Sequence, residues 1–197
     1  MKPVVQSPVR NHKSAGWGGR TGRPALTLVG LLMIGLPAGA HAKDSLAHME
    51  KQVGSFQVSA AILPMSQEQV IAAWNTPREQ SFQADVKDEI AVGSRLSAVV
   101  MFAGAGEENG KVRLHCKTTF VFPDEVQQMA FDGICFDAKL EGPNTDIYLA
   151  HNGTGMVAPA ILAGKSVTVE QVVTDEVAKI TITLRVSVNI VGDESGS

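Results

Sequence analysis

Soft metal ligands are the residues of this sequence with the clearest chemical potential. They lie in the middle of the chain and comprise His115, Cys116, Met129, Cys135, His151 and Met156. Thiolate, imidazole and thioether groups are the ligands that copper takes in proteins. The set therefore raises a copper-binding carrier as one hypothesis.

The spacing of these ligands does not match a blue-copper site, which places a cysteine and its second histidine close together. The first histidine after Cys135 is His151. His115 and Cys116 are adjacent, and adjacent residues of a strand point to opposite faces. We therefore expect no metal site and no cofactor, and keep the copper carrier as an alternative.

A disulfide between Cys116 and Cys135 is the simpler expectation for two cysteines in an exported chain. Closing a loop of this size contributes about 3 kcal/mol in the chain-entropy model. Cys116 falls on the apolar parity of its strand, whereas Cys135 lies between Ile134 and Phe136, which should both point inward in a regular strand. Either Cys135 lies at a bulge or strand end, or the bond does not form.

Motifs of the common enzyme classes are missing from the sequence. There is no Gly-x-Ser-x-Gly elbow, which many serine hydrolases need to present their nucleophile. The glycine-rich segment 104–110 lacks the Lys-Ser or Lys-Thr of a phosphate-binding loop, and Glu107 and Glu108 would repel a phosphate. We expect a noncatalytic protein, with a hydrolase assembled from distant residues as a third alternative.

The N-terminal 42 residues have the pattern of a cleavable signal peptide. Five basic residues and no acidic one occur there, followed by an apolar run from Ala25 to Leu36 and the triplet Ala40-His41-Ala42. Cleavage is expected before Lys43, which places the mature protein in the periplasm or outside the cell. A retained anchor is the alternative, but a spanning helix needs about 20 apolar residues.

Charge limits the partners of the mature chain. The signal would remove five of the 17 Lys and Arg residues and none of the 20 Asp and Glu residues, which leaves 12 against 20 and a net charge of −8. A negative protein is repelled by nucleic acid and by anionic lipid. We expect neither partner, no membrane span after cleavage, and one domain with its own core.

Period-two alternation predicts short strands from Phe56 onward. Residues 43–54 are expected to form a flexible arm, and Ser66 to Trp74 a helix with capping-box spacing between Ser66 and Gln69. The segment 104–110 is expected to be a hairpin loop that joins strands at 96–103 and 112–122. Shorter strands should follow at 128–132, 134–140 and 146–150.

The C-terminal segments 166–174 and 180–190 alternate most regularly, with apolar residues on one parity and polar residues on the other. Each strand thus has one dry and one wet face. Seven or eight such strands predict an all-β domain over residues 55–191, with two antiparallel sheets packed face to face and one short helix. Residues 192–197 are expected to be a disordered tail.

Several turn and core motifs resemble a family of small exported bacterial proteins. The motifs are Ala73-Trp74-Asn75-Thr76-Pro77, Val92-Gly93, Met101-Phe102-Ala103-Gly104, Gly110-Lys111-Val112, Phe122-Pro123-Asp124 and Val173-Thr174-Asp175. The resemblance covers most of the stretch from Trp74 to Ile190 and implies an immunoglobulin-like antiparallel β-sandwich. Two positions depart from the family pattern, Glu125 after Pro-Asp and Lys165-Ser166 after Gly164. The resemblance implies no activity.

A noncatalytic binding or assembly module is the function that these patterns favour. Such a domain would offer its loops or a sheet edge to an envelope protein, whose identity the sequence leaves open. The alternative is a periplasmic carrier of a small ligand or copper. A pilus subunit that exchanges strands is a further alternative, although the long final strand from 180 to 190 gives no sign of a missing one.

Overall fold

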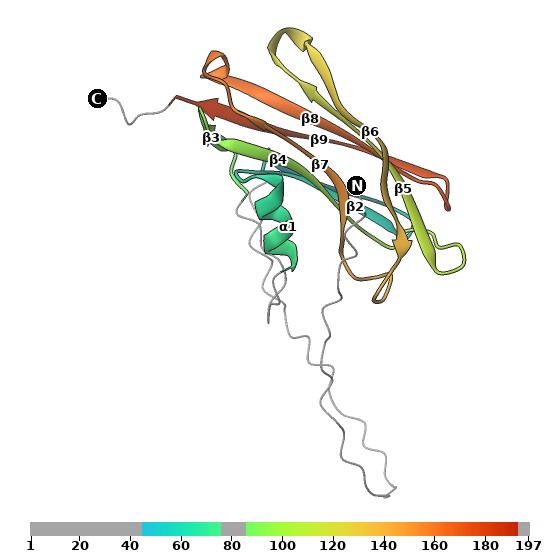
Figure 1. The fold of residues 1–197 in the computed structure, drawn as a ribbon. Coiled ribbons are helices and arrows are strands. Elements are labelled where there is room, and N and C mark those ends of the chain that lie inside the picture. Colours follow the sequence, from blue (N-terminus) through green and yellow to red (C-terminus); the bar gives the residue numbers. More distant parts are fainter. Residues whose placement is uncertain (1–44, 76–85, 193–197) are drawn as a thin grey trace, which may run out of the picture. The chain divides into compact units, whose positions relative to one another are not determined.

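The computed structural model describes residues 45–75 and 86–192 (Figure 1). They belong to one compact unit of the chain. The predicted signal peptide at 1–42 lies outside the described residues, as do all but one residue of the predicted tail.

Strands dominate the described residues, with one α-helix and two short 3-10 helices. In chain order they are β1 (His48–Val53), β2 (Phe56–Leu63), α1 (Gln67–Asn75), β3 (Glu89–Ala91), β4 (Arg95–Ala103), β5 (Lys111–Val121), η1 (Pro123–Glu125), β6 (Gln127–Lys139), β7 (Tyr148–Val157), η2 (Ala160–Leu162), β8 (Lys165–Asp175) and β9 (Ile180–Val191).

Two sheets bury a common core between them. The four-stranded sheet has the order β1-β2-β4-β7 and the five-stranded sheet the order β3-β9-β8-β5-β6. Among the described strands, every pairing is antiparallel except that of β3 with β9. Val58 and Phe102 of one sheet share the core cluster with Leu114 and Val186 of the other. The predicted all-β fold with two sheets and one helix is confirmed.

Helix α1 begins with the predicted capping box. The Ser66 backbone N–H donates to Gln69 Oε1 at 2.8 Å, and the Gln69 N–H donates to Ser66 Oγ at 3.4 Å. Val70 and Trp74 pack in a second apolar cluster with Leu63 of β2. The helix thus covers part of the outer face of the four-stranded sheet (Figure 1).

Residues 48–53 form a strand, β1, where the sequence predicts a flexible arm. β1 pairs with β2 along its whole length, and Met49 packs against the core. The alternation of apolar and polar residues is weak in this segment, because Lys51 occupies an inward-facing position of β1. Its Nζ donates to the Thr183 carbonyl at 2.6 Å. The β-domain therefore starts earlier than residue 55.

Segment 104–110 does not join two paired strands, because β4 and β5 lie in different sheets. The local turn is nevertheless the expected one. Asn109 and Gly110 take positive φ values of 54° and 71°, and Glu108 and Lys111 exchange two backbone hydrogen bonds of 3.0 Å across them. Positive φ at both central residues is the geometry that Asn-Gly favours.

Two predicted breaks fall inside continuous strands. β6 runs through Gly133, which faces Cys116 of β5, and β7 runs through 152–153. Glycine weakens a strand but does not end it when neighbouring pairs hold the ladder. Turn signals alone therefore divided these strands too finely.

Asp175 is fully buried and fastens the loop between the sheets. Its carboxylate accepts hydrogen bonds from the backbone N–H of Gly106 and, at 2.9 Å each, from those of Val177 and Ala178. The side chain thus ties the β4–β5 connection to the β8–β9 turn.

Replacing Asp175 with alanine should lower the free energy of unfolding by about 3 kcal/mol, because three backbone N–H groups would lose their acceptor and the two loops their connection. Urea denaturation measures the change. Glu141→Ala, at an exposed position, is the matched control and should shift stability by less than about 0.5 kcal/mol. Equal effects of the two variants would contradict this role for Asp175.

Candidate functional site

Cys116 and Cys135 are joined by a disulfide, as the sequence predicts. Their sulfur atoms are 2.00 Å apart and their Cα atoms 5.6 Å apart. The two residues are buried, with 0% and 2% of their surface exposed. The bond links β5 to β6, which is an edge strand of the five-stranded sheet.

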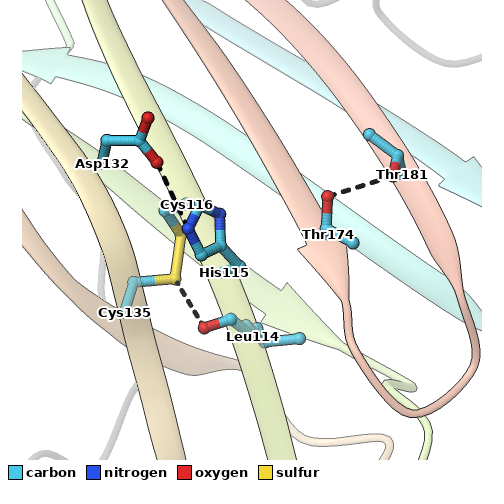
Figure 2. Close-up of polar contacts among 7 residues, drawn as sticks. All are labelled: Leu114, His115, Cys116, Asp132, Cys135, Thr174 and Thr181. Atoms are coloured by element: carbon cyan, nitrogen blue, oxygen red, sulfur yellow. Dashed lines mark hydrogen bonds and ion pairs between the residues drawn. A yellow bond between two sulfur atoms is a disulfide. The ribbon is translucent and has the colours of Figure 1, made fainter. Parts of the chain in front are cut away.

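A β-bulge explains how both cysteines reach the core. Leu114 pairs with Phe136 and His115 with Ile134, so Cys135 is an extra residue on β6. The bulge turns Cys135 toward Cys116 (Figure 2). Its Sγ lies 3.6 Å from the Leu114 carbonyl oxygen, a packing contact, because a disulfide sulfur carries no hydrogen. Of the alternatives that the sequence left open, the structure has the bulge.

The soft ligands do not converge on one point. Both cysteine sulfurs are in the disulfide, and His115 points to the outer face, where its Nε2 lies 3.2 Å from Asp132 Oδ1 (Figure 2). Met129 is exposed, whereas Met156 packs against the core. The described part of the chain contains no group of three His, Cys, Asp or Glu residues with metal-binding geometry. The side chain of His151 is not among those described.

Strand β6 stands out for a different reason, which is that one of its edges pairs with no other strand in the described part of the chain. It is 13 residues long and pairs with β5 on one side. An edge strand presents unpaired backbone N–H and C=O groups that another chain can bind. A second bulge lies at Ala130, because Thr118 pairs with Phe131 and Thr119 with Met129.

The start of β6 is exposed and uncharged, as is Val126 just before it. Val126 has 59% of its surface exposed and Met129 has 61%. All four residues 127–130 are exposed, so both faces of the strand are open there. The segment Val126–Phe131 contains no charged residue, proline or glycine. Charged residues and proline are what proteins usually place on an exposed edge strand to prevent it from pairing with other chains.

Two other edge strands carry these protections. β1 has Glu50 and Lys51 in its middle, and β3 has only three residues. Short length and charge are two ordinary ways of making an edge unattractive to a partner. The uncharged start of β6 thus differs from β1 and β3, although a bulge interrupts it at Ala130. The remaining edge strand, β7, also carries no Asp, Glu, Lys or Arg.

The C-terminal half of β6 is anchored to its neighbours. Asp137 Oδ1 lies 2.7 Å from Lys111 Nζ of β5, and the Phe136 ring packs edge-on against Phe102 at 4.8 Å between centroids. Phe136 also contacts the Tyr148 ring at the start of β7, at 6.4 Å. Side-chain contacts thus hold the C-terminal half, whereas the N-terminal residues are held by their backbone pairing with β5.

Sequence reasoning missed this edge, because it divided β6 at Gly133. The uncharged run from Val126 to Phe131 was the available signal. Which strand lies at an edge depends on the order of strands in the sheet, and that order is not visible in a single strand's pattern.

Comparisons with known proteins add little to this description. No protein-family model and no curated protein sequence matches the chain. One similar solved structure is described as AvmM, which catalyses macrocyclization in alchivemycin A biosynthesis; it has 9% identity and a TM-score of 0.30, and the match covers 76% of this chain and 98% of that one. Such a low TM-score bears on neither fold type nor activity. Within residues 45–75 and 86–192, no helix is long and apolar enough to span a membrane.

The double substitution Cys116→Ala with Cys135→Ala removes the disulfide. It should lower the free energy of unfolding by about 3 kcal/mol, because the unfolded chain regains the entropy that closing the loop removes. Guanidinium denaturation measures this. Thiol alkylation and mass spectrometry under denaturing conditions provide the control. Unreduced protein should take up no label, and labelling of both cysteines would show that the bond is absent.

The pKa of Asp137 is held below its ordinary value, chiefly by the hydrogen bond from Lys111. Lys111→Ala should therefore raise this pKa toward the usual range, as measured by an NMR titration of the carboxyl carbon. Arg113→Ala removes only a weaker coulombic contribution and should raise the pKa less. A larger rise in the Arg113 variant would contradict the Lys111–Asp137 contact.

Proposed function

We propose that this chain is an exported, noncatalytic, immunoglobulin-like binding or assembly module that recognises another protein through the edge of β6. The observation that carries the proposal is the uncharged segment Val126–Phe131, exposed from Val126 to Ala130, at a sheet edge that no other described strand pairs with. In strand addition, the partner's backbone pairs with such an edge and its alternate side chains contact the exposed residues.

The side chains of this segment suit a protein partner. Met129 is flexible and polarisable, so it adapts to apolar surfaces of different shape. Gln127 and Gln128 supply neutral hydrogen-bonding groups beside it. The partner should therefore offer an extended segment with apolar residues at alternate positions.

The two bulges restrict which strands can pair with β6. Each bulge interrupts the regular ladder and increases the local twist, at Ala130 and at Cys135. A long, flat strand would lose register at these positions. A short strand that pairs with the residues before Ala130 is favoured, which gives selectivity and opposes indiscriminate aggregation.

Export is supported by the signal-like N-terminus of the sequence and by the disulfide. Disulfides persist in oxidising compartments such as the periplasm. The Cys116–Cys135 bond also holds β6 on β5, so the edge would be stable in that compartment.

Site-specific photocrosslinking in the cell envelope tests the proposal. A photoreactive amino acid at Met129 should form an adduct with one defined protein, identified by mass spectrometry. The same amino acid at Thr183, which is exposed on the same sheet but on β9, is the matched control and should form none.

A charge at the edge should remove the interaction, because an inserted lysine opposes strand pairing. With the photoreactive group moved to Gln127, Met129→Lys should reduce the adduct by about tenfold, whereas Thr183→Lys should leave it unchanged. Identical adducts at Met129 and Thr183, or no effect of Met129→Lys, would overturn the proposal.

A further inference from the structure

The outer face of the four-stranded sheet carries a groove of about 300 Å³, a size in the range of small-molecule sites. It is lined by His48, Glu50, Gln57, Ser59, Ala61, Val86, Met101, Phe102, Ala103 and Ile147. These residues come mainly from β1, β2 and β4. The groove is thus on the sheet that does not contain β6.

Small side chains create the hollow. Ala61 and Ala103 lie on the outward parity of β2 and β4, with the longer Met101 beside them. Helix α1 covers the neighbouring part of this face, where Val70 packs with Leu63. Ala61 belongs to the same cluster and is almost fully buried, so the accessible apolar floor beyond the helix consists of Met101 and of Ala103, which is 8% exposed.

One wall of the groove is polar and comes from β1 and β2. His48 Nε2 and Ser59 Oγ are 2.8 Å apart, and Gln57 Nε2 donates to Glu50 Oε1 at 2.5 Å. These contacts hold the four side chains in place beside the apolar floor. The groove is therefore amphipathic across its width.

The charge of the lining determines the class of ligand. Glu50 is the lining residue with a permanent charge, and the lining contains no Lys or Arg. A carboxylate at the rim attracts cations and repels anions, more so in a chain of negative net charge. Glu50 Oε2 and Ser59 Oγ are hydrogen-bond acceptors, and an ammonium group has three N–H donors.

We propose that this groove binds a small amphipathic amine, whose apolar body lies on Met101 and Ala103 and whose ammonium group binds Glu50. The site is independent of the proposed protein-binding edge. It gives the domain a second activity, that of carrying or sensing a cationic small molecule.

Titration with three six-carbon probes tests the charge and the apolar floor separately. Hexylammonium, 1-hexanol and hexanoate share one alkyl chain and differ in the charge of the head group. Heteronuclear NMR shifts of the β2 and β4 amides should report binding of hexylammonium roughly fivefold tighter than of hexanol, as expected for one exposed ion pair. Hexanoate should bind more weakly than hexanol.

Glu50→Gln keeps the size of the side chain and removes its charge. This variant should bind hexylammonium and hexanol equally. Glu89→Gln, an exposed position on β3 of the other sheet, makes the same change of net charge and should bind like the unaltered protein. If both variants weakened hexylammonium binding equally, the net charge of the protein would explain the preference, and the proposed site would be wrong.

Ala103→Leu fills the floor and should abolish the shifts with all three probes, with a circular dichroism spectrum that confirms the fold. Because a buried substitution can destabilise the domain, Glu50→Gln at the exposed rim provides an independent test. Binding of hexanoate as tight as hexylammonium, or no saturable binding of hexylammonium, would also overturn the proposal. Met129→Lys should leave hexylammonium binding unchanged, which separates this site from the edge of β6.

Discussion

The mutual burial of two apolar sheet faces is the constraint on which the rest of this structure depends. Alternation along each strand sends every second side chain into the shared core, as Val112 and Leu114 show on β5 and Val186 and Val188 on β9. The intervening residues must then face outward. Loops, edges and outer faces are therefore the places where this domain can contact other molecules, because the core between the sheets is filled by side chains.

The edge strand β6 is firmly attached to the domain but lacks charged residues over part of its length. A disulfide, an ion pair to Lys111 and aromatic contacts of Phe136 fix one part of it to the domain. The other part, from Val126 to Phe131, lacks the charges that make an edge inert. Pairing of residues 127–129 with β5 keeps this part in an extended, preorganised conformation, which lowers the entropic cost of binding a partner strand.

The two surfaces that we propose as sites differ in their chemistry. The edge of β6 is uncharged and offers backbone groups, which suits a peptide strand. The groove on the opposite sheet has an apolar floor beside Glu50 and Ser59, which suits a small cation. Because each lies on its own sheet, substitutions in one need not disturb the other.

Sequence by itself determined the fold class, the capped helix and the C-terminal pair β8 and β9, and it favoured a bond between the two cysteines without settling it. These follow from local signals, namely period-two alternation, the Ser66–Gln69 spacing and cysteine count. The tertiary structure decided that β1 is a strand, that 104–110 crosses between the sheets, and that Cys135 lies in a bulge. It also decided which strand is an edge and where small residues leave a hollow. Those features arise from contacts between segments far apart in the sequence, which a local pattern does not encode.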